Sequence, residues 1–317
     1  MKITQINGAR GLIIKSSIKN AIIDSDVENA SAFDDVIVTH LSLDTLNIIQ
    51  NNSNKFRRIN LSHDLMLLLQ KLWRYNIISR PNVMPNFRIL PTGYKTKLGL
   101  EFNITAYDND DGLIGSIAII IEDTASGEKL GYVPNFITQG QYKNRIKKWK
   151  RMFRDAHLTQ FTSFNSNINP DTTATQVNYT EKSFSENLPS LFSDLTLLQS
   201  WLKPFNPTRL NEINDYSLKQ DQPIIWQCKS AKLLNYYFPD NDFYYIDDGS
   251  EINEKQKNHL ICYTKDEIKK DMLVEKKDPT PLINQIDIYA RKFKHSLPQS
   301  DFSDIVKMIK AQETYMI

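Results

Sequence analysis

The sequence predicts a layered α/β fold, in which apolar strands are covered by amphipathic helices. Short apolar runs separated by turn residues predict strands within residues 1–136. These runs are GLIIKSS, NAIIDSD, DDVIVTH, RRINLS, LEFNITAYD, GSIAIIIED and KLGYVPNF. Most of them are apolar at consecutive positions, which is typical of strands covered on both faces. The stretch 64–75, DLMLLLQKLWRY, predicts a helix that supplies one covering layer.

A second amphipathic helix is predicted over residues 141–155, QYKNRIKKWKRMFRD. Its apolar residues recur at spacings of four, three and four, which places them on one helical face. They are Tyr142, Ile146, Trp149 and Phe153. The opposite face is basic and consists of Lys143, Arg145, Lys147, Lys148, Lys150, Arg151 and Arg154. Such a face is either an ordinary solvated surface, which we favour, or a patch that follows a nucleic-acid backbone.

The second half of the chain predicts another α/β layer. Residues 165–187 are rich in Asn, Thr and Ser and predict a long loop at an internal boundary. Residues 188–202 predict a helix, and residues 222–238 predict a strand, a turn and a helix. The segments 241–248 and 258–264 predict further strands.

The C-terminal segment predicts a last helix over residues 301–312, with Asp301 as its N-cap. Its apolar face consists of Phe302, Ile305, Met308 and Ile309. Residues 315–317 begin what the pattern predicts to be another strand.

The composition is that of a globular chain long enough for one large domain, or for a domain with an inserted subdomain. It has 317 residues, of which 40% are hydrophobic and 24% are charged. Thirty-nine basic and 37 acidic residues give a formal charge of +2, so any nucleic-acid surface must be local. Cys228 and Cys262 are too few for a disulfide scaffold and suit a reducing compartment. We therefore expect a cytoplasmic protein without a signal peptide or a membrane span.

A polar turn directly follows the predicted strand DDVIVTH, and it carries His40 and, four residues later, Asp44. In layered α/β proteins, ligands and metals sit at the carboxyl ends of strands. Taken alone, this pair also fits a capped turn after a strand.

The segment Thr39 to Thr45, THLSLDT, resembles the signature T-H-x-H-x-D-H of the metallo-β-lactamase superfamily. The preceding AIIDSD resembles the strand and aspartate that lead into that signature. The resemblance implies a four-layer αβ/βα sandwich formed by residues 1–164 and 281–317. Residues 165–280 would then form an inserted cap or a β-CASP-like subdomain.

Three later segments resemble the RNA-processing branch of the superfamily, ribonuclease J and its β-CASP relatives. TAYDNDDGLIGSIAIIIED places Asp111 where that branch has a metal-ligating histidine. KLGYVPNF places Asn135 at the aspartate that bridges two metals. The C-terminal segment places His295 at the first histidine of the last motif and Gln299 at the second, which is the ligand.

Most ligand positions implied by this resemblance carry a different residue type. His40 and Asp44 keep the family residue, whereas Ser42, Thr45, Asp111, Asn135 and Gln299 replace it. A catalytic zinc site needs about three protein ligands, and hydroxyl and amide groups bind zinc poorly. We therefore expect no zinc and no other cofactor, although Asp111 beside Asp44 would allow weak binding of Mg²⁺ or Mn²⁺.

These departures lead to three hypotheses on function. The first is a pseudoenzyme related to RNA-processing nucleases that binds a partner protein, a nucleic acid such as RNA or a single strand, or a small ligand. The second is an active metallohydrolase, a ribonuclease or 5′-exonuclease, with an altered site built from Asp44, Asp111, His40 and His295. The third is a structural subunit that pairs with an active paralogue, and a homo-oligomer is also compatible with the sequence.

The remaining aromatic and histidine residues favour structural roles. The aromatic cluster could stack bases, but packing is the favoured interpretation. It consists of Tyr236, Tyr237, Phe238, Phe243, Tyr244 and Tyr245. His63 is expected to cap or begin a helix, and His157 and His259 have no partner at metal-ligand spacing.

Overall fold

The first sheet has six strands in the order β1-β2-β3-β4-β5-β6. The first three strands pair antiparallel, and β3 to β6 pair parallel. The strands are β1 (Lys2–Gln5), β2 (Leu12–Lys15), β3 (Asn20–Ile23), β4 (Asp35–Ile37), β5 (Arg58–Ser62) and β6 (Phe87–Leu90). The computed structural model describes residues 2–5, 11–15, 20–25, 35–51, 55–138, 140, 142–163, 168–169, 199–201, 206–221, 223–246, 261–263 and 297–316.

The second sheet also has six strands, in the order β18-β11-β10-β9-β8-β7. Strands β7 to β10 form an antiparallel meander, and β11 and β18 extend it in parallel. The strands are β7 (Lys95–Leu98), β8 (Phe102–Asp108), β9 (Ile117–Asp123), β10 (Lys129–Val133), β11 (Gln160–Ser163) and β18 (Glu313–Met316).

Side chains from both sheets form one buried core between them. Strand β9 shows how this core arises, because side chains alternate between the two faces of a strand. Ile117, Ile119 and Ile121 face the core between the sheets. Ala118 and Ile120 face the opposite way and are buried in a second core. The consecutive apolar run therefore predicted correctly that both faces of this strand are covered.

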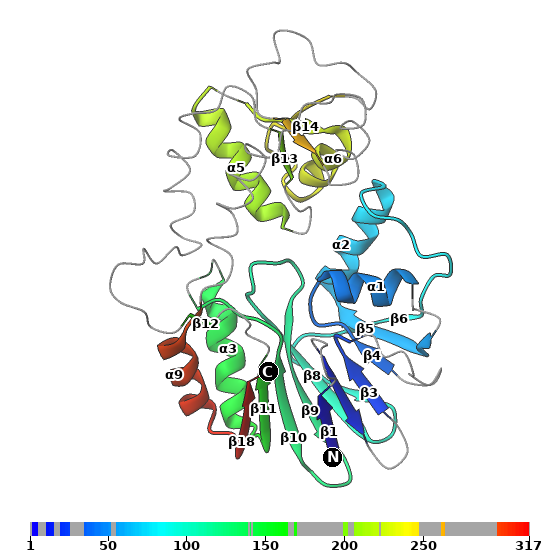
Figure 1. The fold of residues 1–317 in the computed structure, drawn as a ribbon, viewed down its shortest axis with the longest axis vertical. Coiled ribbons are helices and arrows are strands. Elements are labelled where there is room, and N and C mark those ends of the chain that lie inside the picture. Colours follow the sequence, from blue (N-terminus) through cyan, green and yellow to red (C-terminus); the bar gives the residue numbers. More distant parts are fainter. Residues whose placement is uncertain are drawn as a thin grey trace. The chain divides into compact units, whose positions relative to one another are not determined.

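Helices cover the outer faces of the two sheets. Figure 1 shows α1 (Leu43–Asn51) and α2 (His63–Arg74) beside the first sheet, and α3 (Lys143–Asp155) and α9 (Gln299–Ile309) beside the second. The second core joins α3 and α9 to the second sheet through Trp149, Phe153 and Phe302. On the first sheet, Ile23 and Ile37 face the core between the sheets, so the preceding residues Ile22 and Val36 point to the outer face. Both are buried, which shows that the outer face of this sheet is covered as well. The predicted four-layer αβ/βα sandwich is therefore confirmed.

The chain divides into two compact units. The first comprises residues 1–69, 79–177 and 295–317 and contains the sandwich, with the short parallel pair β12 (Ile168–Asn169) and β17 (Leu297–Pro298). The second comprises residues 70–78 and 178–294. The boundaries that the sequence predicts, 164/165 and 280/281, lie outside the described residues.

The second unit contains a parallel four-stranded sheet in the order β13-β16-β14-β15. Helix α5 begins after Asn206, whose side chain accepts a hydrogen bond from the Arg209 backbone N–H (3.1 Å). The elements of this unit are β13 (Gln199–Trp201), α5 (Pro207–Lys219), β14 (Ile225–Gln227), α6 (Cys228–Tyr237), β15 (Tyr244–Ile246) and β16 (Ile261–Tyr263). Within the described residues, no helix is long and apolar enough to cross a membrane.

Several predictions of local structure were wrong. The described part of the helix predicted over 188–202 is strand β13, because pairing with β16 overrides the local helical pattern. Tyr142 is 43% exposed and precedes α3 as its N-cap, so it does not belong to the buried face. Asp301 lies in the first turn of α9 instead of capping it, because the helix begins two residues earlier, at Gln299. Met308 is only half-buried.

Gly115 and Gly93 allow the packing between α2 and the loop before β9 to be tested. Both have φ of 80°, but a Cβ at Gly115 would lie 2.4 Å from the Leu65 backbone nitrogen, whereas a Cβ at Gly93 would meet nothing within 4 Å. We expect Gly93→Ala to lose ~1–2 kcal/mol of unfolding free energy from backbone strain alone. Gly115→Ala should lose a further ~1–3 kcal/mol from the overlap. Urea unfolding of both variants measures the difference, and equal losses would contradict the close approach.

Candidate functional site

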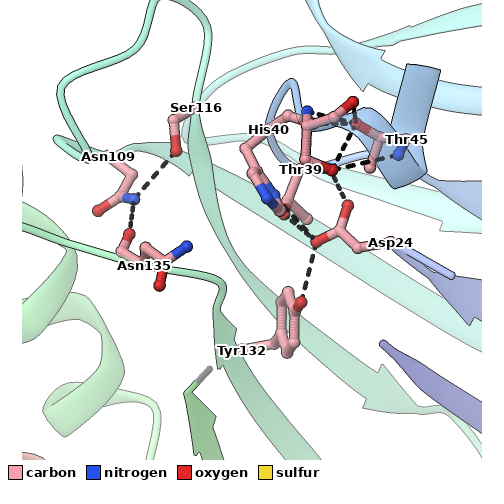
Figure 2. A network of polar contacts seen from close by, with 9 residues as sticks. Asp24, Thr39, His40, Thr45, Asn109, Ser116, Tyr132 and Asn135 are labelled. Atoms are coloured by element: carbon pink, nitrogen blue, oxygen red, sulfur yellow. Dashed lines mark hydrogen bonds and ion pairs between the residues drawn. The ribbon is translucent and has the colours of Figure 1, made fainter. Parts of the chain in front are cut away.

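A buried carboxylate organises the carboxyl ends of β3 and β4. Asp24 follows β3 with φ of 51°, a left-handed conformation that aspartate tolerates better than most residues. Its side chain accepts hydrogen bonds from the Thr39 backbone N–H (2.7 Å), the Thr39 hydroxyl and the Tyr132 hydroxyl (2.9 Å). Figure 2 shows these contacts. Because Tyr132 lies on β10, the carboxylate links the two sheets of the sandwich.

Tyr132 serves this cluster as a hydrogen-bond donor. Burial, and then the neighbouring charge of Asp24, raise the pKa of Tyr132 well above its ordinary value. The phenol therefore stays protonated at physiological pH and donates a hydrogen bond to the carboxylate.

His40 lies beside the same carboxylate and is 8% exposed. Its Nδ1 is 3.5 Å from Asp24 Oδ2 and 3.4 Å from the Thr39 hydroxyl oxygen. A carboxylate at Nδ1 fixes the orientation of the imidazole ring. The candidate ligand His40 is therefore held by residues at the carboxyl ends of β3 and β4.

Ser42 and Thr45 form a reciprocal cap at the start of α1. The Ser42 hydroxyl accepts from the Thr45 backbone N–H (3.2 Å), and the Thr45 hydroxyl accepts from the Ser42 backbone N–H (2.7 Å). The Thr45 hydroxyl also donates to the His40 carbonyl (2.9 Å). This is the arrangement of a capping box, with threonine in place of the usual Glu or Gln. Both hydroxyl groups are thus engaged with the backbone of their own turn.

Asp44 is exposed in the first turn of α1. A negative charge there is favourable because the amino end of a helix carries a partial positive charge. Among the described residues, no group of three or more His, Cys, Asp or Glu side chains is placed to hold a metal ion. The described residues at this centre therefore do not supply the three protein ligands that a catalytic zinc site needs.

Asp111 is buried in the loop between β8 and β9 and is 2% exposed. Burial raises the pKa of Asp111 to about 6. The charge of His40, the hydrogen bond from the Leu113 backbone N–H (2.9 Å) and the hydrogen bond with the Ser116 side chain lower this pKa, but burial outweighs them. The Ile117 backbone N–H donates to the Thr39 carbonyl (2.9 Å), so this loop is tied to the end of β4. The structure thus brings together Asp111 and His40.

A second buried network surrounds Asn109. Its side-chain NH₂ donates to the Asn135 carbonyl (2.6 Å) and to the Ser116 hydroxyl (3.0 Å), as Figure 2 shows. Its side-chain oxygen accepts from the Trp149 indole N–H (3.2 Å). The Asn135 side-chain oxygen is buried and has no hydrogen-bond partner among the described residues. The network joins the ends of β8 and β10 to α3.

The remaining candidate ligands lie elsewhere or outside the described residues. Gln299 is the first residue of α9 and is exposed. His295 and His259 lie outside the described residues. His63 begins α2, as predicted, and is exposed, and His157 is exposed and follows α3 with φ of 53°.

No pattern in the sequence predicted a site role for Tyr132, Asn109 or Asp110. Tyr132 could not be found from its neighbours in sequence, because its partner Asp24 is 108 positions away. One feature of the sequence could have indicated Asn109 and Asp110 as site residues, because they are polar and follow the carboxyl end of an apolar strand.

The basic residues of α3 divide into engaged and available groups. Arg145 lies 4.2 Å from the centre of the Tyr142 ring, and Arg154 pairs with Asp155 (2.9 Å). Four of the others are exposed and Lys150 is half-buried. In the part of the chain that the structure describes, no ion pair engages these five: Lys143, Lys147, Lys148, Lys150 and Arg151.

The aromatic cluster of the second unit is less packed than the sequence favoured. Tyr236, Tyr244 and Tyr245 are 39%, 55% and 52% exposed, whereas Phe243 is buried. Tyr244 and Tyr245 lie on β15, which is the last strand in the order of this sheet.

The fold and the site define an αβ/βα sandwich whose strand ends are held by buried hydrogen bonds. A protein of unknown function from Enterococcus faecalis V583 has the same fold, with a TM-score of 0.66 and 12% identity over 99% of this chain and 93% of the other. A metallo-β-lactamase HARLDQ-motif mutant from Cronobacter sakazakii superposes with a TM-score of 0.38 and 14% identity over 48% and 72%. Zn²⁺-bound PqqB from Methylobacterium extorquens gives 0.34 and 8% over 48% and 58%. The chain matches no protein-family model and no curated protein.

Asp111 makes stability depend on pH in a defined direction. Because its folded-state pKa of about 6 lies above that of an unfolded aspartate, the folded state binds the proton more tightly. Its contribution to stability is complete below pH ~4 and is lost as the pH rises through the folded-state pKa. We expect Asp111→Asn to gain roughly 2–4 kcal/mol relative to the wild type between pH 4 and pH 7.

Urea unfolding of the wild type and of Asp111→Asn across this pH range measures the gain. Asp44→Asn removes an exposed carboxylate in the first turn of α1 and serves as the control. An unchanged pH dependence in Asp111→Asn would show that Asp111 is not the group that titrates.

Proposed function

We propose that this protein is a non-catalytic member of the metallo-β-lactamase superfamily, related to its RNA-processing nucleases, that acts by binding a partner. The reciprocal cap of Ser42 and Thr45 is the observation that supports it, because two positions that bear histidine ligands in the resembled family here stabilise a helix start. A metal-generated hydroxide would require about three ligands around an open position. The substituted centre offers hydroxyl and amide groups at most of those positions.

The metal content of the protein tests this proposal. Protein purified without chelator should carry far less than one zinc, manganese or iron per chain, and added Zn²⁺ or Mn²⁺ should not raise its melting temperature. A rise in the melting temperature of the wild type with either metal would support the altered, active hydrolase instead.

The double variant Ser42→His/Thr45→His serves as the positive control. It restores the motif around His40 and Asp44, so it should gain a zinc-dependent rise in melting temperature. Without zinc it should lose ~1–2 kcal/mol because the cap of α1 is removed.

The specific partner that we propose is single-stranded nucleic acid, bound along α3. The available cations Lys143, Lys147, Lys150 and Arg151 recur at helical spacings of three, four or one, which arranges them along one side of the helix. On the adjoining side of the helix, Ile146, Trp149 and Phe153 are buried in the core that joins α3 to the second sheet. A row of cations on a fixed support suits the phosphates of a polyanion backbone.

Binding of a fluorescent 20-nucleotide oligouridylate tests this partner. Affinity should fall steeply with salt, and Lys147→Gln/Arg151→Gln should reduce the slope of log K against log [salt] by about 1.4, at about 0.7 per phosphate contact. Lys15→Gln/Lys219→Gln removes two exposed lysines outside α3 and should leave the slope unchanged. Absent or salt-independent binding would favour a partner protein.

A further inference from the structure

Helix α3 begins without the features that usually stabilise a helix start. Its N-cap is Tyr142, which provides no side-chain hydrogen bond, and its first turn contains no acidic residue. That turn instead contains Lys143 and Arg145. Positive side chains at the amino end of a helix add to the partial positive charge of the exposed N–H groups. The start of the basic helix therefore needs stabilisation from another part of the chain.

Asp110, from the loop between β8 and β9, supplies the missing carboxylate. Its Oδ2 accepts a hydrogen bond from the Tyr142 backbone N–H (2.7 Å), and its Oδ1 accepts from the Gly112 backbone N–H (3.2 Å). Asp110 is 2% exposed. Burial raises the pKa of Asp110, whereas the two backbone N–H groups and the charge of Arg145 oppose this shift.

The chain around Asp110 is shaped to hold this contact. A Cβ at Gly140 would lie 2.2 Å from Asp110 Oδ2, so the backbone before α3 lies directly against the carboxylate. The preceding residue, Asn109, binds the Trp149 indole N–H through its side chain and an Arg145 N–H through its carbonyl (3.5 Å). Two consecutive loop residues thus hold the first two turns of α3.

We propose that Asp110 is a positioning residue, which fixes the amino end of α3 so that its available cations are presented in one geometry to a polyanion. The inference rests on the proposed binding of single-stranded nucleic acid. A helix end that is already ordered does not have to lose conformational freedom on binding, so binding is tighter. The same loop carries Asp111 beside His40, so the basic surface and the substituted centre share one support.

Two substitutions separate positioning by hydrogen bonds from an effect of charge. Asp110→Ala removes both, and we expect it to weaken oligouridylate binding by about three- to tenfold. Asp110→Asn keeps an acceptor for the Tyr142 N–H and should restore most of the affinity. If Asp110 acted only through its negative charge, both variants would bind the oligonucleotide more tightly, which would overturn the proposal.

Hydrogen exchange measured by mass spectrometry tests the same role without any ligand. In Asp110→Ala, amides of residues 145–149, which are the first to bond within the helix, should exchange about fivefold faster, the effect of losing a typical cap, while amides of β9 keep their protection. Unchanged exchange at 145–149 would overturn the proposal. If the wild type fails to bind oligouridylate but the exchange result holds, the proposed partner is wrong and the positioning of α3 stands.

Asp123→Ala is the matched control for both measurements. Asp123 is also a buried turn carboxylate, and it accepts hydrogen bonds from the backbone N–H groups of Ala125 (2.9 Å) and Ser126 (3.3 Å) between β9 and β10. Its loss should lower the melting temperature without changing affinity or exchange in α3. Equal losses of affinity in Asp123→Ala and Asp110→Ala would show that general destabilisation is the cause.

Discussion

The hydrogen bonds to the Asp24 carboxylate join the strand ends of one sheet to the other sheet. A buried carboxylate is unfavourable unless donors replace its water, and here Thr39 supplies two donors and Tyr132 a third. Since the donors come from the end of β4 and from β10, the charge is stable only when the two sheets are packed together. The position of His40, and of the α1 cap behind it, depends on this contact.

A second set of ties, in the loop between β8 and β9, completes the centre. Asn109 and Asp110 hold α3, the Ser62 hydroxyl donates to the Gly115 carbonyl (2.6 Å) at the start of α2, and the Ile117 N–H binds the Thr39 carbonyl. Metal ions often connect loops of this kind by coordinating several of them at once. Here, hydrogen bonds connect them, which explains how a centre with so few ligand-type residues stays ordered.

Much of the sandwich could be predicted because its strands are covered on both faces and therefore read as continuous apolar runs. Strands β1, β6 and β7 were not predicted because they are short edge strands that contain polar residues. Strand β11 was not predicted because its sequence, QFTS, has no apolar run. At the site, the sequence predicted that Asp24, Thr39 and His40 follow two consecutive strands. The contacts of Asp110 and Asn109 with α3 span 32 and 40 residues, and local patterns carry no information over such separations.

The edge strand β7 has a consequence for the behaviour of the protein at high concentration. Strand β7 ends the second sheet, so among the described strands none pairs with one side of its backbone in that sheet. Lys95 and Lys97 are exposed on one face of the strand, while Leu98 is buried on the other. Lys95 pairs with Glu122 (2.6 Å), whereas two molecules that paired along this edge would bring their Lys97 side chains together, and that repulsion opposes aggregation through the sheet edge. The buried Leu98 thus packs the strand onto the core, while the exposed lysine disfavours pairing of this edge with another molecule.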